Sequence, residues 1–232
     1  MNKEYDGTVN FPSSMSEKCK QVFNNGGLSR IFKYAFELGY HLVKPRTTFI
    51  FKDRKYKCFY HWYNTTWRGE REIELSIFLD ILKKNTGSLL EFGNVLQNYI
   101  NIKHDIVDRY EKANNVINED IITFNPNKKY NTILSISTLE HVGWDETPRD
   151  PQKIHEAFNS LKKLLDINGS IIFSVPLGFN SYLDDLILNK KLVTSESHFF
   201  KRINGLWVEK KLEDVGSVNL HDDLFIGVIK ND

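Results

Sequence analysis

Cysteine is scarce in this chain. Cys19 and Cys58 lie 39 positions apart, and no CxxC spacing occurs. A disulfide framework and a cysteine-rich zinc site both need paired or clustered thiols, so neither is indicated. We interpret both residues as ordinary thiols.

Long apolar runs are also missing. No stretch approaches the ~20 apolar residues that span a bilayer. The first six residues, MNKEYD, lack the positively charged and then apolar pattern of a signal peptide. The sequence therefore predicts a cytoplasmic protein with no membrane partner.

An excess of charge of either sign is absent as well. The 232 residues carry 31 basic and 30 acidic side chains, for a formal net charge of +1. This balance argues against a strong nonspecific attraction to nucleic acid or to an anionic membrane. We expect a small-molecule partner, and one α/β domain with an elaboration fits the length.

The first 86 residues are expected to form an amino-terminal elaboration that caps the acceptor side. Residues 1–27 are polar and end in the breaker NNGG, which favours a surface arm. Three further elements follow from periodicity and composition: a helix from Leu28 that stops at Gly39, a hairpin within 47–67 around the charged turn 52–55, and a helix over 72–84.

From Ser88 onward, short apolar runs alternate with polar or helical segments. Near-continuous Ile, Val and Leu indicate strands that are covered on both faces. This order predicts a doubly wound, mostly parallel α/β sheet of the seven-stranded, Rossmann-like type over residues 87–232. The expected strands are 89–92, 106–107, 121–124, 133–136, 171–175 and 224–229. A short helix over 95–100 is expected between the first two.

Open α/β sheets bind ligands beyond the carboxyl ends of their strands. Four such ends carry polar residues in this chain. They are LLEFGN at 89–94, DIVDRYE at 105–111, VINEDII at 116–122 and YNTILSISTLEHV at 130–142. In this order the four segments resemble the motifs of class I S-adenosylmethionine-dependent methyltransferases.

The resemblance implies S-adenosyl-L-methionine as the cofactor. By position, Gly93 would stand beside its methionine part and Glu91 would orient its amino group. Asp108, with Glu111 as a competitor, would bind the ribose hydroxyls. The full set implied for the cofactor is Glu91, Gly93, Asn94, Asp108, Glu111, Asp120, Ile121, Ser137 and Glu140, with Asp120 and Ile121 at the adenine. The alternative at these positions is an ordinary strand-end turn or a solvated charge.

His141 is the candidate catalytic residue. Methyl transfer is an in-line displacement, so the enzyme supplies alignment and, for a hydroxyl acceptor, a base. A histidine at a strand end titrates near neutrality and suits that role. The loop after it carries Asp145, Glu146, Arg149 and Asp150. These residues could bind an acceptor or a metal, but a solvated loop is the more frequent explanation, and no metal is predicted.

Aromatic residues interleaved with amides and arginines are typical of a surface that stacks on sugars or bases. The predicted acceptor-binding residues are His61, Tyr63, Asn64, Trp67, Arg68, Arg71 and Trp144. This pattern is similar to methyltransferases encoded beside polysaccharide-synthesis enzymes.

The resulting hypothesis is O-methylation of a sugar, glycan precursor or other small metabolite by an enzyme of the EC 2.1.1 type. One alternative is a nucleic-acid methyltransferase, which the neutral charge and the lack of an Asn/Asp-Pro-Pro-aromatic motif after Ile136 disfavour. The other is a catalytically inactive binding protein with this fold. It is suggested by Asn94, Val95 and Leu96 where the family usually has two further glycines.

Overall fold

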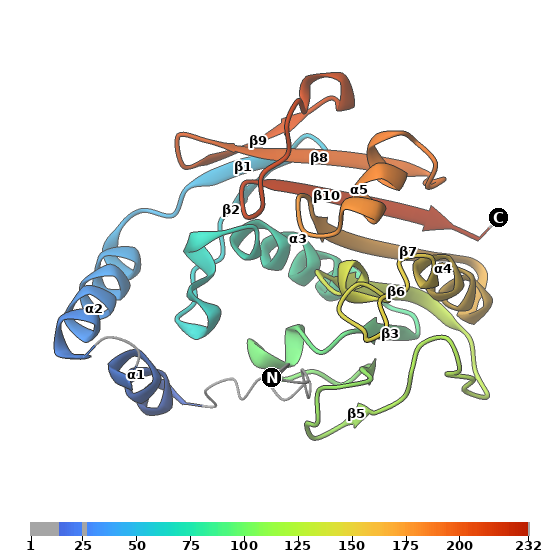
Figure 1. The fold of residues 1–232 in the computed structure, drawn as a ribbon, viewed down its shortest axis with the longest axis horizontal. Coiled ribbons are helices and arrows are strands. Elements are labelled where there is room, and N and C mark those ends of the chain that lie inside the picture. Colours follow the sequence, from blue (N-terminus) through green and yellow to red (C-terminus); the bar gives the residue numbers. More distant parts are fainter. Residues whose placement is uncertain (1–13, 25–26, 232) are drawn as a thin grey trace.

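The computed structural model describes residues 14–24 and 27–231 of the chain. Its centre is an eight-stranded sheet with the order β5-β4-β3-β6-β7-β10-β8-β9, and a two-stranded hairpin, β1-β2, lies beside it (Figure 1). The strands are β1 (Thr48–Phe51), β2 (Arg54–Lys57), β3 (Leu89–Phe92), β4 (Asp105–Val107), β5 (Val116–Ile117), β6 (Tyr130–Ile136), β7 (Leu165–Pro176), β8 (Glu196–Ile203), β9 (Leu206–Lys210) and β10 (Asp223–Lys230).

Helices precede and connect these strands. The α-helices are α1 (Met15–Asn24), α2 (Gly27–Val43), α3 (Arg71–Lys84), α4 (Lys153–Leu164) and α5 (Ser181–Leu188). Short 3-10 helices are η1 (Tyr63–Arg68), η2 (Leu96–Asn98), η3 (Leu139–His141) and η4 (Leu212–Asp214). In the described part of the chain, no helix is long and apolar enough to cross a bilayer.

Strands β3 to β7 run parallel to their neighbours, whereas β10 runs antiparallel to β7 and β8. The chain moves from β3 outward to β4 and β5 and then returns to the other side of β3 to form β6. The predicted mostly parallel, Rossmann-like sheet is thus confirmed. The reversal at β3 and β6 is the point where open α/β sheets bind ligands.

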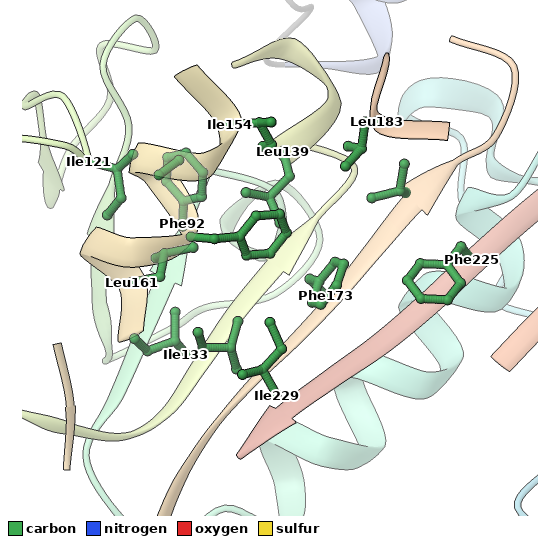
Figure 2. Packing of buried hydrophobic residues seen from close by; sticks show 14 of the residues in the cluster. Phe92, Ile121, Ile133, Leu139, Ile154, Leu161, Phe173, Leu183, Phe225 and Ile229 are labelled. Carbon is green, nitrogen blue, oxygen red and sulfur yellow. The ribbon is translucent and has the colours of Figure 1, made fainter. Parts of the chain in front are cut away.

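Each face of the sheet is covered by a separate apolar cluster. On one face, Phe92, Ile133 and Phe173 from the strands pack with Ile154 of α4 and Leu183 of α5 (Figure 2). On the other face, α3 and the β1-β2 hairpin pack against β6, β8 and β10. Burial on both sides explains the continuous apolar runs of the strands.

Helix α3 begins at the carboxyl edge of the sheet and ends near the start of β3. Its side chains Ile73, Ile77 and Phe78 are fully buried in the same cluster as Leu134 of β6. The helix therefore covers the face of the central sheet, although it precedes residue 86. The division of the chain at that residue stays a prediction.

The predicted strand over 121–124 is wrong. The third parallel strand is β5, and residues 121–123 form a turn. The amides of Thr123 and Phe124 bond to the Asp120 carbonyl, while Ile121 and Phe124 insert into the core near α4. Their apolar character reflects this packing and not a strand ladder.

Four other expectations need correction. The segment 95–100 contains only the single turn η2, and α2 continues past Gly39 to Val43. His41 in that extension stacks on Trp67, with ring centroids 4.8 Å apart. Within 1–27, residues 15–24 form helix α1, whereas 1–13 and 25–26 lie outside the described residues. Strands β8 and β9, absent from the sequence-based expectation, extend the sheet beyond β10.

A buried carboxylate ties α3 to the outermost strand. Glu72 accepts a hydrogen bond of 2.7 Å from Trp207 Nε1 on β9, and Arg202 lies 3.4 Å from the same oxygen. Burial raises the pKa of Glu72 to about 7, although Trp207 and Arg202 both act to lower it. The folded protein therefore holds a proton on this group that the unfolded chain releases near pH 4.5.

We predict that Glu72→Gln removes a pH-dependent loss of stability. Because the folded-state pKa is raised, the contribution of Glu72 falls as pH rises from about 4.5 to about 7. At pH 8 the variant should be more stable than the wild type by up to about 3 kcal/mol, at ~1.4 kcal/mol per pKa unit. Urea unfolding at pH 5 and pH 8 measures the difference. If the free energies of unfolding of variant and wild type differed by the same amount at pH 5 and pH 8, the prediction would be contradicted.

Candidate functional site

The turn after β3 is shaped by a close approach between Gly93 and Thr138. Gly93 has a φ of +89°, and a Cβ atom built on it would lie 2.1 Å from Thr138 Oγ1. Its amide donates to the Val107 carbonyl at 2.9 Å. The absence of a side chain therefore lets the turns after β3 and β6 pack together at the point where the strand order reverses.

Glu91 is fully buried, and both of its carboxylate oxygens are engaged. Oε1 accepts from the amides of Val95 and Leu96 at 2.9 and 2.8 Å, and Oε2 lies 2.8 Å from His104 Nε2. The side chain thus holds the turn after β3 and the start of η2. Glu91 was predicted either to orient the amino group of a cofactor or to belong to an ordinary strand-end turn. This geometry supports the second role, in which Glu91 positions the turn.

Asp108 is engaged in a similar way. Its carboxylate accepts from the amides of Asn94, Tyr110 and Glu111 at 3.2, 2.8 and 2.8 Å. Asn94 Nδ2 donates to Glu111 Oε1 at 2.9 Å, while Asn94 Oδ1 is buried with no hydrogen-bond partner. Burial, and then the charge of Asp108, raise the pKa of Glu111. Asn94 and Glu111 therefore form one acceptor-rich pair beside the turn.

Asp120 belongs to an ion-pair network. Its Oδ2 lies 2.8 Å from Arg109 Nη1 and 3.2 Å from Lys153 Nζ of α4, which also bonds to Glu146. Partial burial acts to raise the pKa of Asp120, but the Ile122 amide, Lys153 and Arg109 together lower it. Neighbouring Ile121 is turned into the core. Asp120 therefore joins the turn after β5 to the start of α4, and Ile121 packs in the core beside it.

A charged cluster lies where α3 meets the ends of β6 and β7. Glu74, fully buried, accepts from Ser137 Oγ at 2.5 Å and from Ser174 Oγ at 2.6 Å. Arg71 Nη1 lies 3.1 Å from its other oxygen. Burial raises the pKa of Glu74, whereas Arg71 acts in the opposite direction. The sequence analysis singled out Arg71 and Ser137 but not Glu74 or Ser174. The feature that could have identified Glu74 is a glutamate within the apolar run of α3.

Glu140 is a second buried acid of this region, and one of its oxygens lacks a hydrogen-bond partner. Its side chain is 1% exposed, and Oε2 has no hydrogen-bond partner. Burial raises the pKa of Glu140 well above its ordinary value, and the nearby Glu74 adds to the effect. The backbone is held in place because Asn180 Nδ2 donates to the Glu140 carbonyl at 2.8 Å. A buried acceptor without a partner is costly, so it favours a donor ligand here.

His141 follows directly and is half exposed. Its Nδ1 lies 2.6 Å from Asp145 Oδ2, and its Nε2 lies 3.7 Å from Glu140 Oε1. The ring of Phe179 packs against it at a centroid distance of 4.8 Å. When Nδ1 donates to Asp145, Nε2 becomes the basic nitrogen. The arrangement can accept a proton from a hydroxyl.

The predicted acceptor residues separate into groups. His61, Tyr63 and Phe59 pack around Tyr99 with ring centroids 5.3 to 6.0 Å apart, and Asn64 lies exposed in η1.

Three others have different partners. Trp67 is buried against His41, and Arg68 pairs with Glu37 of α2. Trp144 carries the Arg149 guanidinium over its ring at 4.3 Å. The structure thus brings His61 and Tyr63 together and directs Trp67 and Arg68 toward α2.

No protein-family model matches the chain, and no curated protein sequence matches it. Among solved structures, it is similar to the N-methyltransferase NodS from Bradyrhizobium japonicum WM9 in complex with S-adenosyl-L-homocysteine, with 14% identity over 70% of this chain and 87% of that chain and a TM-score of 0.45. It is also similar to an rRNA methylase from Streptococcus thermophilus, with 10% identity over 68% and 97% and a TM-score of 0.42.

A third structure is the magnesium protoporphyrin IX methyltransferase from Synechocystis PCC 6803 with bound SAM. It is 9% identical over 100% of both chains, with a TM-score of 0.42. These likenesses concern the Rossmann-like methyltransferase fold alone.

We predict that Gly93→Ala destabilises the fold by about 2–3 kcal/mol, because it adds backbone strain at positive φ to a clash with Thr138. Thr138→Ala in the same chain should recover part of the loss, since it removes the two nearest atoms. Gly205→Ala is the matched control: its φ is +76°, but nothing lies within 4 Å. Urea unfolding of the double-mutant cycle measures the coupling. Equal losses at positions 93 and 205 would contradict the packing role.

Proposed function

We propose that this chain is an S-adenosylmethionine-dependent methyltransferase that binds the cofactor at the carboxyl ends of β3 and β6. The observation that carries the proposal is the unpartnered oxygen of Glu140. It lies in a buried, acidic surrounding, two residues after the Thr138 that contacts Gly93. This is the reversal point of the sheet, where the fold class binds ligands.

The residues present fit such a cofactor. S-adenosyl-L-methionine carries a positive sulfonium and a positive ammonium, and it supplies a methyl group that is already activated for transfer. Glu74, Glu111 and Glu140 lie at this edge with Arg71 as the cation that pairs with Glu74, and Asn94 Oδ1 and Glu140 Oε2 are buried acceptors without hydrogen-bond partners. A cation with N–H donors would satisfy both.

Roles within the predicted cofactor set follow from these contacts. Asn94, Glu111 and Glu140 would bind the cofactor, because they retain acceptor capacity. Glu91 and Asp108 are positioning residues, because backbone amides occupy their oxygens. Backbone amides held by the buried Glu91 and the half-buried Asp108 keep the turn rigid where the further glycines are missing.

The acceptor in this proposal is a hydroxyl of a sugar, glycan precursor or other small metabolite, as in polysaccharide synthesis. His141 Nε2 would take the hydroxyl proton while Asp145 holds the imidazole through Nδ1. The aromatic group around Tyr99 offers a surface on which a sugar ring can stack. Trp67 and Arg68 are left out of the acceptor set, since both contact α2.

Glu140→Gln should weaken binding of S-adenosyl-L-homocysteine at least about tenfold at pH 7.5, because the neutral amide loses the attraction to the ammonium. Burial raises the pKa of Glu140, so cofactor binding should drive its ionisation and release a proton. Wild-type affinity should therefore rise with pH, and that slope should be absent in the variant.

Titration calorimetry in two buffers of different ionisation enthalpy measures both quantities. Glu156→Gln, at an exposed position on α4, is the matched control. Failure of the wild type to bind would overturn the proposed function. Normal binding by Glu140→Gln, with proton release intact, would remove Glu140 from the site.

His141→Gln should lower turnover about 10²–10⁴-fold without loss of cofactor affinity, because glutamine donates and accepts hydrogen bonds but takes no proton near neutrality. Asp145→Asn should give a smaller loss, since the imidazole remains but its orientation is no longer held. Transfer of a labelled methyl group to a panel of sugars and sugar nucleotides measures the rates. Full activity in His141→Gln with an unchanged pH profile would exclude it as the base.

A further inference from the structure

Helix α2 carries an apolar stripe on its solvent side. Leu28, Phe32, Phe36 and Tyr40 recur every four residues, and Val43 lies on the same arc at 3.6 residues per turn. Their exposed fractions are 64%, 71%, 76%, 47% and 82%. Nothing in the part of the chain that the structure describes covers this stripe.

The opposite side of α2 faces the protein. Tyr34 is buried, and its hydroxyl lies 3.4 Å from the Trp62 carbonyl of the segment before η1. His41 stacks on Trp67, and Glu37 pairs with Arg68. The helix is therefore attached along one side, and its most apolar side points away. In Figure 1, α1 and α2 lie at the edge of the molecule, apart from the sheet.

The segment that carries the stripe is basic. Residues 15–46 contain Lys18, Lys20, Arg30, Lys33, Lys44 and Arg46 against only two acids, Glu17 and Glu37, in a chain with a net charge of +1. Lys33 and Lys44 lie on the same border of the stripe at different positions along it. Lys44 Nζ lies 5.2 Å from the centroid of the Tyr40 ring. The acid within α2, Glu37, is turned to Arg68.

We propose that α2 docks this protein on an anionic lipid bilayer, lying in the interface plane with the stripe inserted among the lipids. An amphipathic helix with Phe and Leu on one face and lysines on its border is suited to that position. The basic border complements acidic headgroups, with long lysine side chains reaching them from the helix. The inference is independent of the proposed catalytic function. It departs from the expectation of no membrane partner, because the charge is local to residues 15–46.

The proposal predicts that the wild-type protein sediments with vesicles containing phosphatidylglycerol but not with pure phosphatidylcholine vesicles. Phe32→Ser with Phe36→Ser should lower the partition coefficient at least about 100-fold, since each exposed ring that no longer inserts costs about tenfold or more. Lys33→Gln with Lys44→Gln should weaken binding and flatten its dependence on salt between about 50 and 500 mM.

Ile167→Ser with Val193→Ser is the matched control, because both residues are highly exposed apolar side chains outside α2. This variant should bind as the wild type does. Wild-type protein that ignores anionic vesicles, or a Phe32→Ser and Phe36→Ser variant that still binds them, would overturn the proposal. Sedimentation velocity tests whether a second copy of the chain covers the stripe instead. A wild-type dimer that becomes a monomer in the variant Phe32→Ser with Phe36→Ser would assign the stripe to that second copy and overturn the proposal.

Discussion

The burial of acidic side chains at the carboxyl edge of the sheet is the constraint on which the site depends. Glu72, Glu74, Glu91 and Glu140 are each at most 1% exposed. A buried carboxylate is costly unless it accepts hydrogen bonds or pairs with a cation. Partners from α3, β7, β9 and the turns after β3 and β6 meet Glu72, Glu74 and Glu91, and the need for them fixes how the elements join. Glu74 Oε2 and Glu140 Oε2 both lack a hydrogen-bond partner, but Arg71 lies 3.1 Å from the Glu74 oxygen and forms an ion pair with it.

The short connection between β3 and β4 determines how this edge of the sheet is built. Only η2 lies between these strands, so a long crossover helix is missing there. Glu91 compensates by binding two amides of this connection and His104 at its end. Asp108 does the same for the turn after β4. The carboxylates that resemble cofactor ligands in the sequence therefore act first as supports for irregular backbone.

The proposed lipid surface and the candidate functional site share one structural link. Helix α2 contacts η1 and the residue before it, and α3 follows three residues after η1, with Arg71 and Glu74 at its start. A bilayer that fixes α2 would therefore also restrain the segment that leads to the charged cluster. An acceptor presented near a membrane surface would suit this arrangement.

Local pattern in the sequence determined the elements that are both apolar and regular. The spacing of apolar residues along an element follows from the side chains that the element must bury, whatever its neighbours are. This applies to α3, β3, β6, β7 and β10. The same logic failed at 121–124, because an apolar turn inserted into a core and a buried strand have the same composition.

Only the tertiary structure decided which polar groups meet. Ser174 lies 100 residues from Glu74, and no spacing rule connects them. The sequence also showed Phe32, Tyr34 and Phe36 as one apolar set, whereas packing buries Tyr34 and leaves both phenylalanines in solvent. Apolar residues at helical spacing indicate that a helix has an apolar face. Which part of that face is covered depends on the shape of the surface it meets, and that surface is made by residues distant in the chain.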